Sequence, residues 1–411
     1  MVSISLEFEV HQPRRTVFLS PGKLLPSGRI TPDRLESVYF DSETNRKIFR
    51  KVADKCYLPA TFILLKEADR LKGRFKMAFS LTGTFIEQAE EYAPEVLENF
   101  RHLSETGAVE FIDETYYHSL SSLFGDNREE FVDQIREHRG KMMDLFGQSP
   151  KIFRNTEFIF NNAIAKTVAG LGYKGIYTEG IDWILHGWKS PNHLYSVKDA
   201  PGIMALLRNY RLSDDIGYRF SARWWNEWPL TAEKYAAWLS ETTGDFANIC
   251  IDFETFGEHQ WKDTGIFSFV ENLPEKILDY PQLSFAKPSE LVERFKPVGE
   301  IDVFEYSTIS WADLERDTSA WLGNRMQQIA FEEIKGIGEL VKKTGRPEHR
   351  RIWKLLQTSD HYYYMCTKWL GDGDVHSYFA HIKNPYEAYA SFISILSDFK
   401  ARLASELVGD A

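Results

Sequence analysis

Cysteine is scarce in this chain of 411 residues, which holds three widely separated thiols, Cys56, Cys250 and Cys366. An odd and sparse set is not the framework of a disulfide-stabilised secreted domain. Without a Cys-x-x-Cys pair it does not indicate a zinc site either. We therefore expect reduced and mostly buried thiols.

Targeting and membrane-spanning segments are also missing from the sequence. The first residues, Met1 to Glu9, lack the basic start and the continuous apolar stretch of a signal peptide. No run approaches the roughly 18 apolar residues that a membrane helix needs. We therefore expect a cytoplasmic protein.

Positive charge is in deficit, because 49 Lys and Arg face 60 Asp and Glu and give a formal net charge of −11. Nucleic acids and anionic membranes are usually bound through basic patches, so neither is an expected partner. The dinucleotide fingerprint and the phosphate loop are absent, and no cofactor is indicated. The charge balance suits a neutral substrate, while the oligomeric state stays open.

Strand-like and helix-like segments alternate over about 300 residues, beginning with the period-two segment Ile4 to Val10. Such alternation predicts a parallel sheet with crossover helices, and seven or eight strands favour closure into a barrel. Beyond about residue 310 the pattern is helical only. The sequence predicts a barrel over 1–300 and a helical domain over 301–411 that contributes to the active-site rim. Residues 182–230 fit no clear element.

The most informative segment is an apolar run, Ile249 to Ile251, followed closely by Asp252, Glu254, Glu258 and His259. Carboxylates gathered in a partly dry site repel one another, so at least one pKa should rise. Barrel enzymes place their chemistry at the ends of such strands. We therefore expect a catalytic acid here.

Three more polar segments come at or just after predicted strands: His11-Gln12-Pro13, Gly107 to Glu110, and Phe153 to Glu157. Parallel strands of one barrel would bring all four segments to the same face. A pair of carboxylates in one pocket suits glycosidic bond cleavage, because one can attack the sugar while the other protonates the leaving oxygen.

Five motifs together resemble the signature regions of glycoside hydrolase family 57, and most closely its α-amylase-type members. They are His11-Gln12-Pro13, Gly107-x-x-Glu110, Arg154-Asn155-Thr156-Glu157, Asp252-x-Glu254-Thr255-x-Gly257-Glu258-His259 and Gln357-Thr358-Ser359-Asp360. The resemblance runs from residue 11 to about 364. It implies a distorted, TIM-like (β/α)7 barrel followed by a helical region, and a retaining enzyme for α-1,4-glucans that requires no metal.

The resemblance also implies residue roles. Glu157 falls on the nucleophile and Asp252 on the general acid/base. Four positions fall on the lining of the glucose subsites: His11, Glu110, Glu254 and Asp360.

Other candidates come from the residues themselves. Arg154 would favour the ionised form of Glu157, although Glu110 could equally be a structural partner of Arg154. His259 is a candidate sugar contact or a hydrogen-bond partner of the neighbouring acids. Within the cluster Trp224, Trp225 and Trp228, we take Trp225 as the candidate stacking platform, with core packing as its alternative.

Several functions stay open at this point. The run Tyr362 to Tyr364 stands where transferase-like relatives use tryptophan, so a 4-α-glucanotransferase or a branching enzyme is the first alternative. A metal-dependent carbohydrate deacetylase would hold zinc with His11, Asp252 and His259. A non-catalytic glycan-binding protein is the third alternative.

Overall fold

The computed structural model describes residues 1–19, 25–26, 28, 30–125, 128–368 and 380–409. The chain divides into two compact units. The barrel unit comprises residues 1–12, 48–116 and 132–311, and the helical unit comprises 13–47, 117–131 and 312–411. Both units are therefore discontinuous in sequence, and the predicted division at residue 300 stays a prediction.

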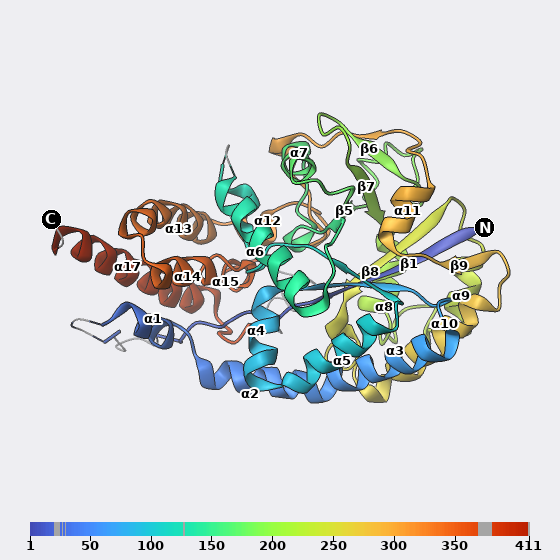
Figure 1. Cartoon of the computed structure of the whole chain (residues 1–411), viewed down its shortest axis with the longest axis horizontal. Helices are drawn as coiled ribbons and strands as arrows, with labels where there is room; N and C mark the ends of the chain where they lie inside the picture. The colour runs from blue at the N-terminus through green and yellow to red at the C-terminus, as the bar shows by residue number, and fades with distance from the viewer. Residues whose placement is uncertain (20–24, 27, 29, 126–127, 369–379, 410–411) are drawn as a thin grey trace. The chain divides into compact units, whose positions relative to one another are not determined.

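A ring of seven parallel strands forms the centre of the barrel unit within the described residues (Figure 1). The ring runs in the order β1 (Val2–Val10), β2 (Met77–Leu81), β3 (Val109–Ile112), β4 (Ile152–Phe153), β5 (Gly175–Glu179), β7 (Met204–Arg208) and β8 (Phe246–Asp252), and β8 pairs again with β1. Two seams are narrow. The bridge Asp113–Phe153 joins β3 to β4, and the pair Arg208–Asn248 joins β7 to β8. The predicted (β/α)7 TIM-like barrel is confirmed as a nearly closed ring.

Three further strands extend the sheet outside the ring. They are β6 (Tyr195–Val197), antiparallel to β7, then β10 (Glu300–Ile301), parallel to β6, and β9 (Leu283–Phe285), parallel to the start of β1. The segment 182–230, which the sequence pattern left unassigned, thus supplies β6, the ring strand β7 and α8 (Tyr210–Gly217).

Strand β1 shows how the ring partitions its side chains. Ile4, Leu6 and Phe8 join the apolar cluster between the ring and its helices, whereas the alternate residues, among them Glu7 and Glu9, face the interior. All nine residues of β1 are buried. The polar half of the period-two pattern therefore lines the inside of a barrel and does not face water.

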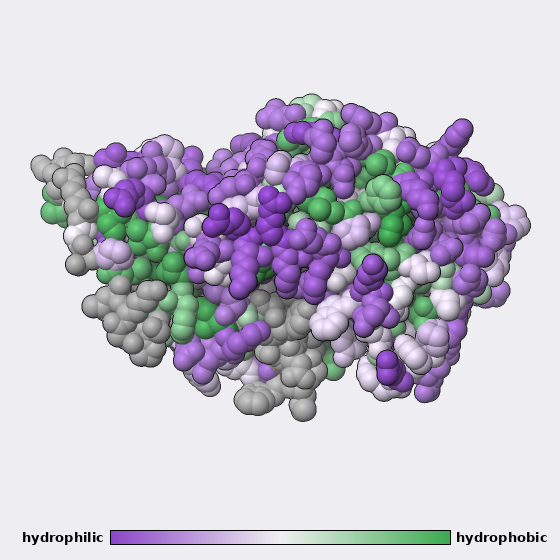
Figure 2. Space-filling view, turned by 90° about the horizontal axis from the view of Figure 1, so that it is seen from below, coloured by the Kyte–Doolittle hydropathy of each residue, from purple (hydrophilic) through white to green (hydrophobic). Residues whose placement is uncertain are grey.

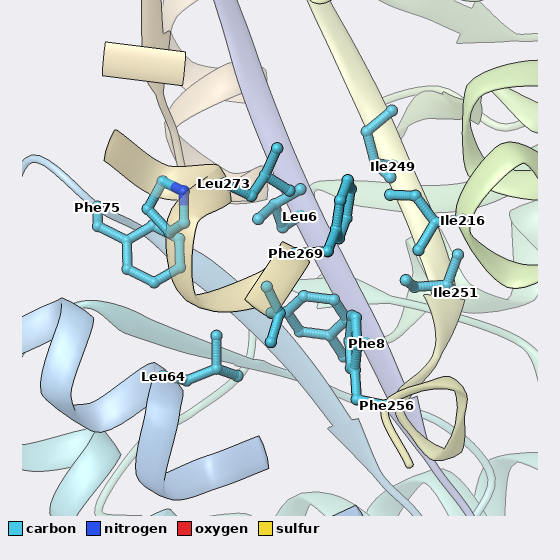
Figure 3. A pocket seen from close by; sticks show the side chains of 12 residues that line it. Leu6, Phe8, Leu64, Phe75, Ile216, Ile249, Ile251, Phe256, Phe269 and Leu273 are labelled. Atoms are coloured by element: carbon cyan, nitrogen blue, oxygen red, sulfur yellow. The ribbon is translucent and has the colours of Figure 1, made fainter. Parts of the chain in front are cut away.

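The outer apolar layer is tightly filled. Figure 3 shows side chains of β1, β8, α3 (Leu58–Leu71) and α10 (Ile266–Leu278) that point toward one another around a cavity of about 10 Å³. So small an apolar space is a packing gap in the core. Burial of this layer against the helices is what holds the ring closed.

Helices α3 and α10 are two of the helices that surround the ring. The others are α4 (Gly83–Tyr92), α5 (Pro94–Glu105), α7 (Asn162–Gly170), α8, α9 (Ala232–Ser240) and α11 (Pro288–Arg294), and a π-helix, Ala53–Tyr57, leads into α3. Two helices cross the sequence boundaries of the units: α2 (Ser42–Val52) and α6 (Glu129–Phe146).

The helical unit is built from α1 (Pro32–Tyr39), α12 (Ser319–Leu322), α13 (Arg325–Thr344), α14 (Pro347–Leu355), α15 (Ser359–Tyr363) and α17 (Pro385–Gly409). Helix α13 packs against α14 and α17. The segment 117–131 joins this unit through a bridge between Ser119 and Thr358. A helical C-terminal region is thus confirmed.

The described part of the face drawn in Figure 2 is mostly hydrophilic, with apolar side chains in small groups. None of the helices in the described residues has the length and apolar character to cross a membrane.

Candidate active site

The carboxyl ends of the ring strands gather a set of ionisable side chains within the barrel unit. Because the strands are parallel, these ends lie on one side of the barrel. The set comprises Glu9 and His11 from β1, Arg154 and Glu157 from the turn after β4, Arg208 from the end of β7, and Asp252 and Glu254 from the end of β8. The sequence had predicted five of these seven.

Glu157 has an unusual backbone. It lies in a short 3-10 turn, Thr156–Phe158, with φ 56° and ψ 25°, and the next residue, Phe158, also has a positive φ of 53°. Residues other than glycine rarely adopt this left-handed backbone conformation, and such strain concentrates at functional sites. Neighbouring groups hold the turn, since the amide of Phe158 donates to the carbonyl of Asn155 at 2.9 Å.

Trp311 forms hydrogen bonds to both the backbone and the side chain of Glu157. Its backbone N–H donates to the Glu157 carbonyl at 3.2 Å, and its indole Nε1–H donates to the Oε2 atom of the Glu157 carboxylate at 2.8 Å. An N–H donor stabilises the charged form of a carboxylate and fixes its direction. Trp311 therefore aims Glu157.

Asp252 ends β8 on the inner side of the ring and is half-buried. Burial, followed by the charge of Glu9, raises the pKa of Asp252 to about 7. Glu157 raises this pKa further, whereas Arg154 and Arg208 oppose the rise. Glu157 and Asp252 are thus close enough to influence each other, and a pKa of about 7 leaves Asp252 mostly protonated below neutral pH.

Arg154 is fully buried, forms an ion pair with Glu9, and has its Nε atom 3.5 Å from the carboxyl of Glu7. Burial opposes its charge, yet Glu9 and Glu7 raise the pKa of Arg154 above its ordinary value. Its guanidinium carbon also lies 4.6 Å from the centre of the Trp311 ring. The expectation that Arg154 supports Glu157 stays a prediction, and in the structure both side chains contact Trp311.

A second buried cation, Arg208, faces Trp311 at 5.5 Å. It is held by Glu179 at 2.9 Å and by Asp214 at 2.6 Å. Two guanidiniums therefore lie near the indole that binds the Glu157 carboxylate, and each has acidic partners of its own.

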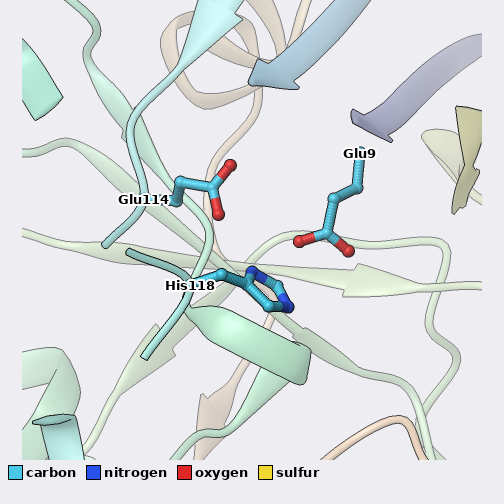
Figure 4. A group of neighbouring side chains, drawn as sticks. All are labelled: Glu9, Glu114 and His118. Atoms are coloured by element: carbon cyan, nitrogen blue, oxygen red, sulfur yellow. The ribbon is translucent and has the colours of Figure 1, made fainter. Parts of the chain in front are cut away.

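Glu9 and Glu114 bring further negative charge to the ends of β1 and β3. Figure 4 shows their carboxylates pointing toward one another, and an oxygen of each lies within 4.8 Å of the other. Glu114 accepts a hydrogen bond from the Ser80 hydroxyl at 2.6 Å. His118, also drawn in Figure 4, belongs to the helical unit.

The acidic loop after β8 is fixed by the π-helix and by the end of α2. The Tyr57 hydroxyl donates to Glu254, while Lys51 and Lys55 form ion pairs with Glu258. Gly257 is required here, because its φ is +122° and a Cβ would lie 2.0 Å from the carbonyl oxygen of Lys55. Glu254 and Glu258 therefore brace the loop.

Two predicted contacts, His11 and His259, lie at this loop. His11 follows β1, its Nδ1 is 3.0 Å from the Thr82 hydroxyl, and its backbone N–H donates to Glu254 at 3.3 Å. Burial lowers the pKa of His259 to about 4, so its ring is neutral at pH 7. The backbone N–H of His259 donates to the Glu254 carbonyl at 2.9 Å, which ties the histidine to the loop.

Glu110 does not join this group, and its prediction as a subsite residue is corrected. It lies near the start of β3, where its carboxylate accepts the backbone N–H of Ser289 at 3.0 Å. Burial raises the pKa of Glu110 to about 7. The alternative role as partner of Arg154 also falls, because Glu110 sits toward the amino ends of the strands.

Trp225 is half-buried and packs edge-on against Trp238, with ring centres 5.9 Å apart. Its packing alternative is therefore the one seen. In the same loop Trp224 is 70% exposed and Trp228 is 44% exposed. Asp360 lies in the first turn of α15 in the helical unit, where the Tyr364 hydroxyl donates to it at 3.4 Å.

Residues 5–304 match the family model described as glycosyl hydrolase family 57. The chain belongs to this family. It is 49% identical over 405 residues to a Methanocaldococcus jannaschii protein named "Putative alpha-amylase", an alignment that covers 97% of this chain and 84% of that one. It is therefore a family 57 glycoside hydrolase.

Solved structures share the fold of this family 57 chain. The 4-α-glucanotransferase from Thermococcus litoralis has a TM-score of 0.68 at 17% identity, and the match covers 96% of this chain and 60% of that one. The family 57 branching enzyme from Thermococcus kodakaraensis has a TM-score of 0.68 at 13% identity, with 99% and 90% covered. At these identities the likeness shows the fold alone.

The zinc ligands that the deacetylase alternative requires do not lie together in the described part of the structure. Across the described residues, His11, Asp252 and His259 do not form a group whose ligand atoms all lie within 4.8 Å of one another. The geometry therefore gives the deacetylase reading no support.

Four residues of the family 57 site escaped the sequence reasoning: Glu7, Glu9, Trp311 and Arg208. The sequence could have indicated Glu7 and Glu9, because they alternate with the apolar residues of β1 and come shortly before the His11 motif. Trp311 had none, because it lies 154 residues from Glu157 in the chain.

Proposed function

We propose that this family 57 enzyme is a retaining hydrolase of α-1,4-glucans, of the α-amylase type, in which Glu157 is the nucleophile and Asp252 the acid/base. One observation carries the proposal: two mutually influencing carboxyls at the same end of the barrel have opposite environments. An indole N–H binds Glu157, whereas burial and Glu9 raise the pKa of Asp252 to about 7. Environments that separate two carboxyls in this way assign one as nucleophile and the other as proton donor.

The reaction follows from these roles. The Glu157 carboxylate attacks the anomeric carbon, the bond to the leaving oxygen breaks, and the Asp252 proton goes to that oxygen. Water then gives a proton to Asp252 and attacks the anomeric carbon, and the ester to Glu157 breaks. Two inversions give net retention, which requires carboxyls about 5–5.5 Å apart.

The substrate class rests on the family, on the name of the relative from Methanocaldococcus jannaschii, and on the site. A neutral glucan suits a chain with a net charge of −11. Trp224 and Trp228, exposed on the loop between α8 and α9, offer apolar ring faces on which sugar rings can stack. His11 and Glu254 supply polar groups at the end of the barrel.

Incubation with maltooligosaccharides tests this proposal, with product lengths resolved by chromatography and the first-formed anomer read by NMR. Shorter products that appear first as the α-anomer are expected. The variant E157Q should lose at least about 10⁴-fold in turnover. Its matched control, E293Q, makes the same chemical change at an exposed residue of α11 and should keep wild-type rates.

The other outcomes are equally informative. Longer products formed with retention would replace hydrolysis by glucan transfer at the same site. A first product with the β-anomer would show single displacement and would refute Glu157 as the nucleophile. Undiminished turnover in E157Q would refute it as well.

A further inference from the structure

Glu9 is the last inward-facing residue of β1 and is 2% exposed. In the parallel register of β1 and β8, Glu9 stands opposite Asp252. The two side chains therefore leave neighbouring strands at the same level and on the same, inner side of the ring. No motif of the family resemblance includes Glu9.

The buried cation Arg154 makes this neighbour consequential. A guanidinium with no exposed surface cannot be stabilised by water and depends on buried anions. Arg154 forms an ion pair with Glu9, the Glu7 carboxyl lies 3.5 Å from its Nε atom, and the rings of Phe158 and Trp311 cover its flanks. Without an anion beside it, this positive charge would favour the ionised form of Asp252.

We propose that Glu9 is a positioning residue for Asp252. The Glu9 carboxylate neutralises the Arg154 guanidinium, and Asp252 therefore keeps the proton that the leaving oxygen takes. The inference rests on the proposed function, because it takes Asp252 as the acid. Glu9 itself does not reach the sugar in this role. It acts through the charge balance of the barrel interior.

Ionisable side chains from several ring strands face Asp252. They are Glu7 and Glu9 on β1, Arg154 and Glu157 after β4, Arg208 on β7, and Glu254 after β8. After burial, the charge of Glu9 raises the pKa of Asp252 most, Glu157 adds to the rise, and Arg154 opposes it. Burial raises the pKa of Glu7 to about 8, so Glu7 is mostly uncharged at neutral pH and cannot replace Glu9 there.

The test compares E9Q with E7Q. E9Q removes one negative charge at constant shape, so Asp252 should lose its proton at lower pH. The alkaline limb of kcat/KM against pH should then move down by about 1 unit or more. E7Q replaces a carboxyl that is already mostly neutral, so its alkaline limb should stay in place. E9D keeps the charge and should restore most of the wild-type limb.

A second readout does not depend on turnover. In protein labelled with ¹³C at the aspartate carboxyls, the Asp252 signal, assigned by its absence in D252N, should titrate at lower pH in E9Q than in wild type. An unchanged Asp252 titration in folded E9Q would overturn the inference. So would an equal shift in E7Q. A shifted titration in a protein without glucan turnover would support the charge role and refute the proposed function alone.

Discussion

Replacing Asp252 with asparagine should separate proton donation from nucleophilic attack. With its pKa raised to about 7 from an ordinary value of 3.8, Asp252 is about 90% protonated at pH 6, whereas an ordinary aspartic acid would be under about 1% protonated. The environment thus supplies about a hundredfold more of the acid form. Because the proposed mechanism uses the protonated form of Asp252, kcat/KM should fall about tenfold for each pH unit above 7.

D252N cannot donate a proton, so on maltooligosaccharides it should lose about 10² to 10⁴-fold in kcat/KM, and the remaining activity should lack the alkaline limb near pH 7. On α-maltosyl fluoride the loss should be far smaller, because fluoride leaves with little help from an acid. Stopped-flow release of fluoride should show a burst, since the second step still lacks its base.

E157Q provides the contrast, because a variant without the nucleophile should be equally inactive on both substrates. The reasoning would be refuted if D252N lost the same factor on α-maltosyl fluoride as on maltooligosaccharides. An alkaline limb near pH 7 that persisted in D252N would refute it too, since that limb would then belong to another group.

Two further predictions concern Trp311 and Glu110. W311F removes the N–H donor to Glu157 and should lower kcat/KM about tenfold to hundredfold on both substrates, as expected for a hydrogen bond to a charged group worth about 1.5–3 kcal/mol; an unchanged rate on the fluoride would contradict its role in aiming Glu157. E110Q removes a carboxyl whose pKa is raised to about 7 and whose stabilising contribution is therefore full below about pH 4.5 and lost as pH rises through 7. Relative to E110Q, the unfolding free energy of wild type in urea should thus fall by up to about 3 kcal/mol between pH 5 and pH 8, while kcat/KM of E110Q stays within about twofold; an equal fall in both proteins would contradict the placement of Glu110.

Sequence periodicity predicted most ring strands because the fold is built from local patterns. Strand β8 is an apolar run and β5 a short β-rich segment, so each carries its own signal. Strand β7 was missed because it lies among residues rich in Trp, Gly and Pro that read as a loop. The interleaving of 13–47 and 117–131 with the C-terminal helices depends on contacts distant in sequence, which periodicity does not report.

The site shows the same division. The motifs place Glu157, Asp252, His11 and Glu254 at or shortly after the ends of strands, and the structure has them there. It could not place Glu110, because a short motif does not reveal at which end of a strand a side chain lies. A period of two usually indicates a half-exposed strand with its polar face in water, so the pattern alone does not single out Glu9. In a closed ring that face is the interior.

Three acids lie at or just after the end of β8, and apart from the family resemblance their spacing gives no reason to choose among them. The choice is made by the segment Ser42–Leu71, which is remote in the chain. Its Tyr57 hydroxyl binds Glu254, and its Lys51 and Lys55 bind Glu258. Asp252 instead faces inward, opposite Glu9. These contacts hold Glu254 and Glu258 in the loop, so Asp252 is the acid that faces the barrel interior. A change in the π-helix should therefore disturb the loop more than it shifts the pKa of Asp252.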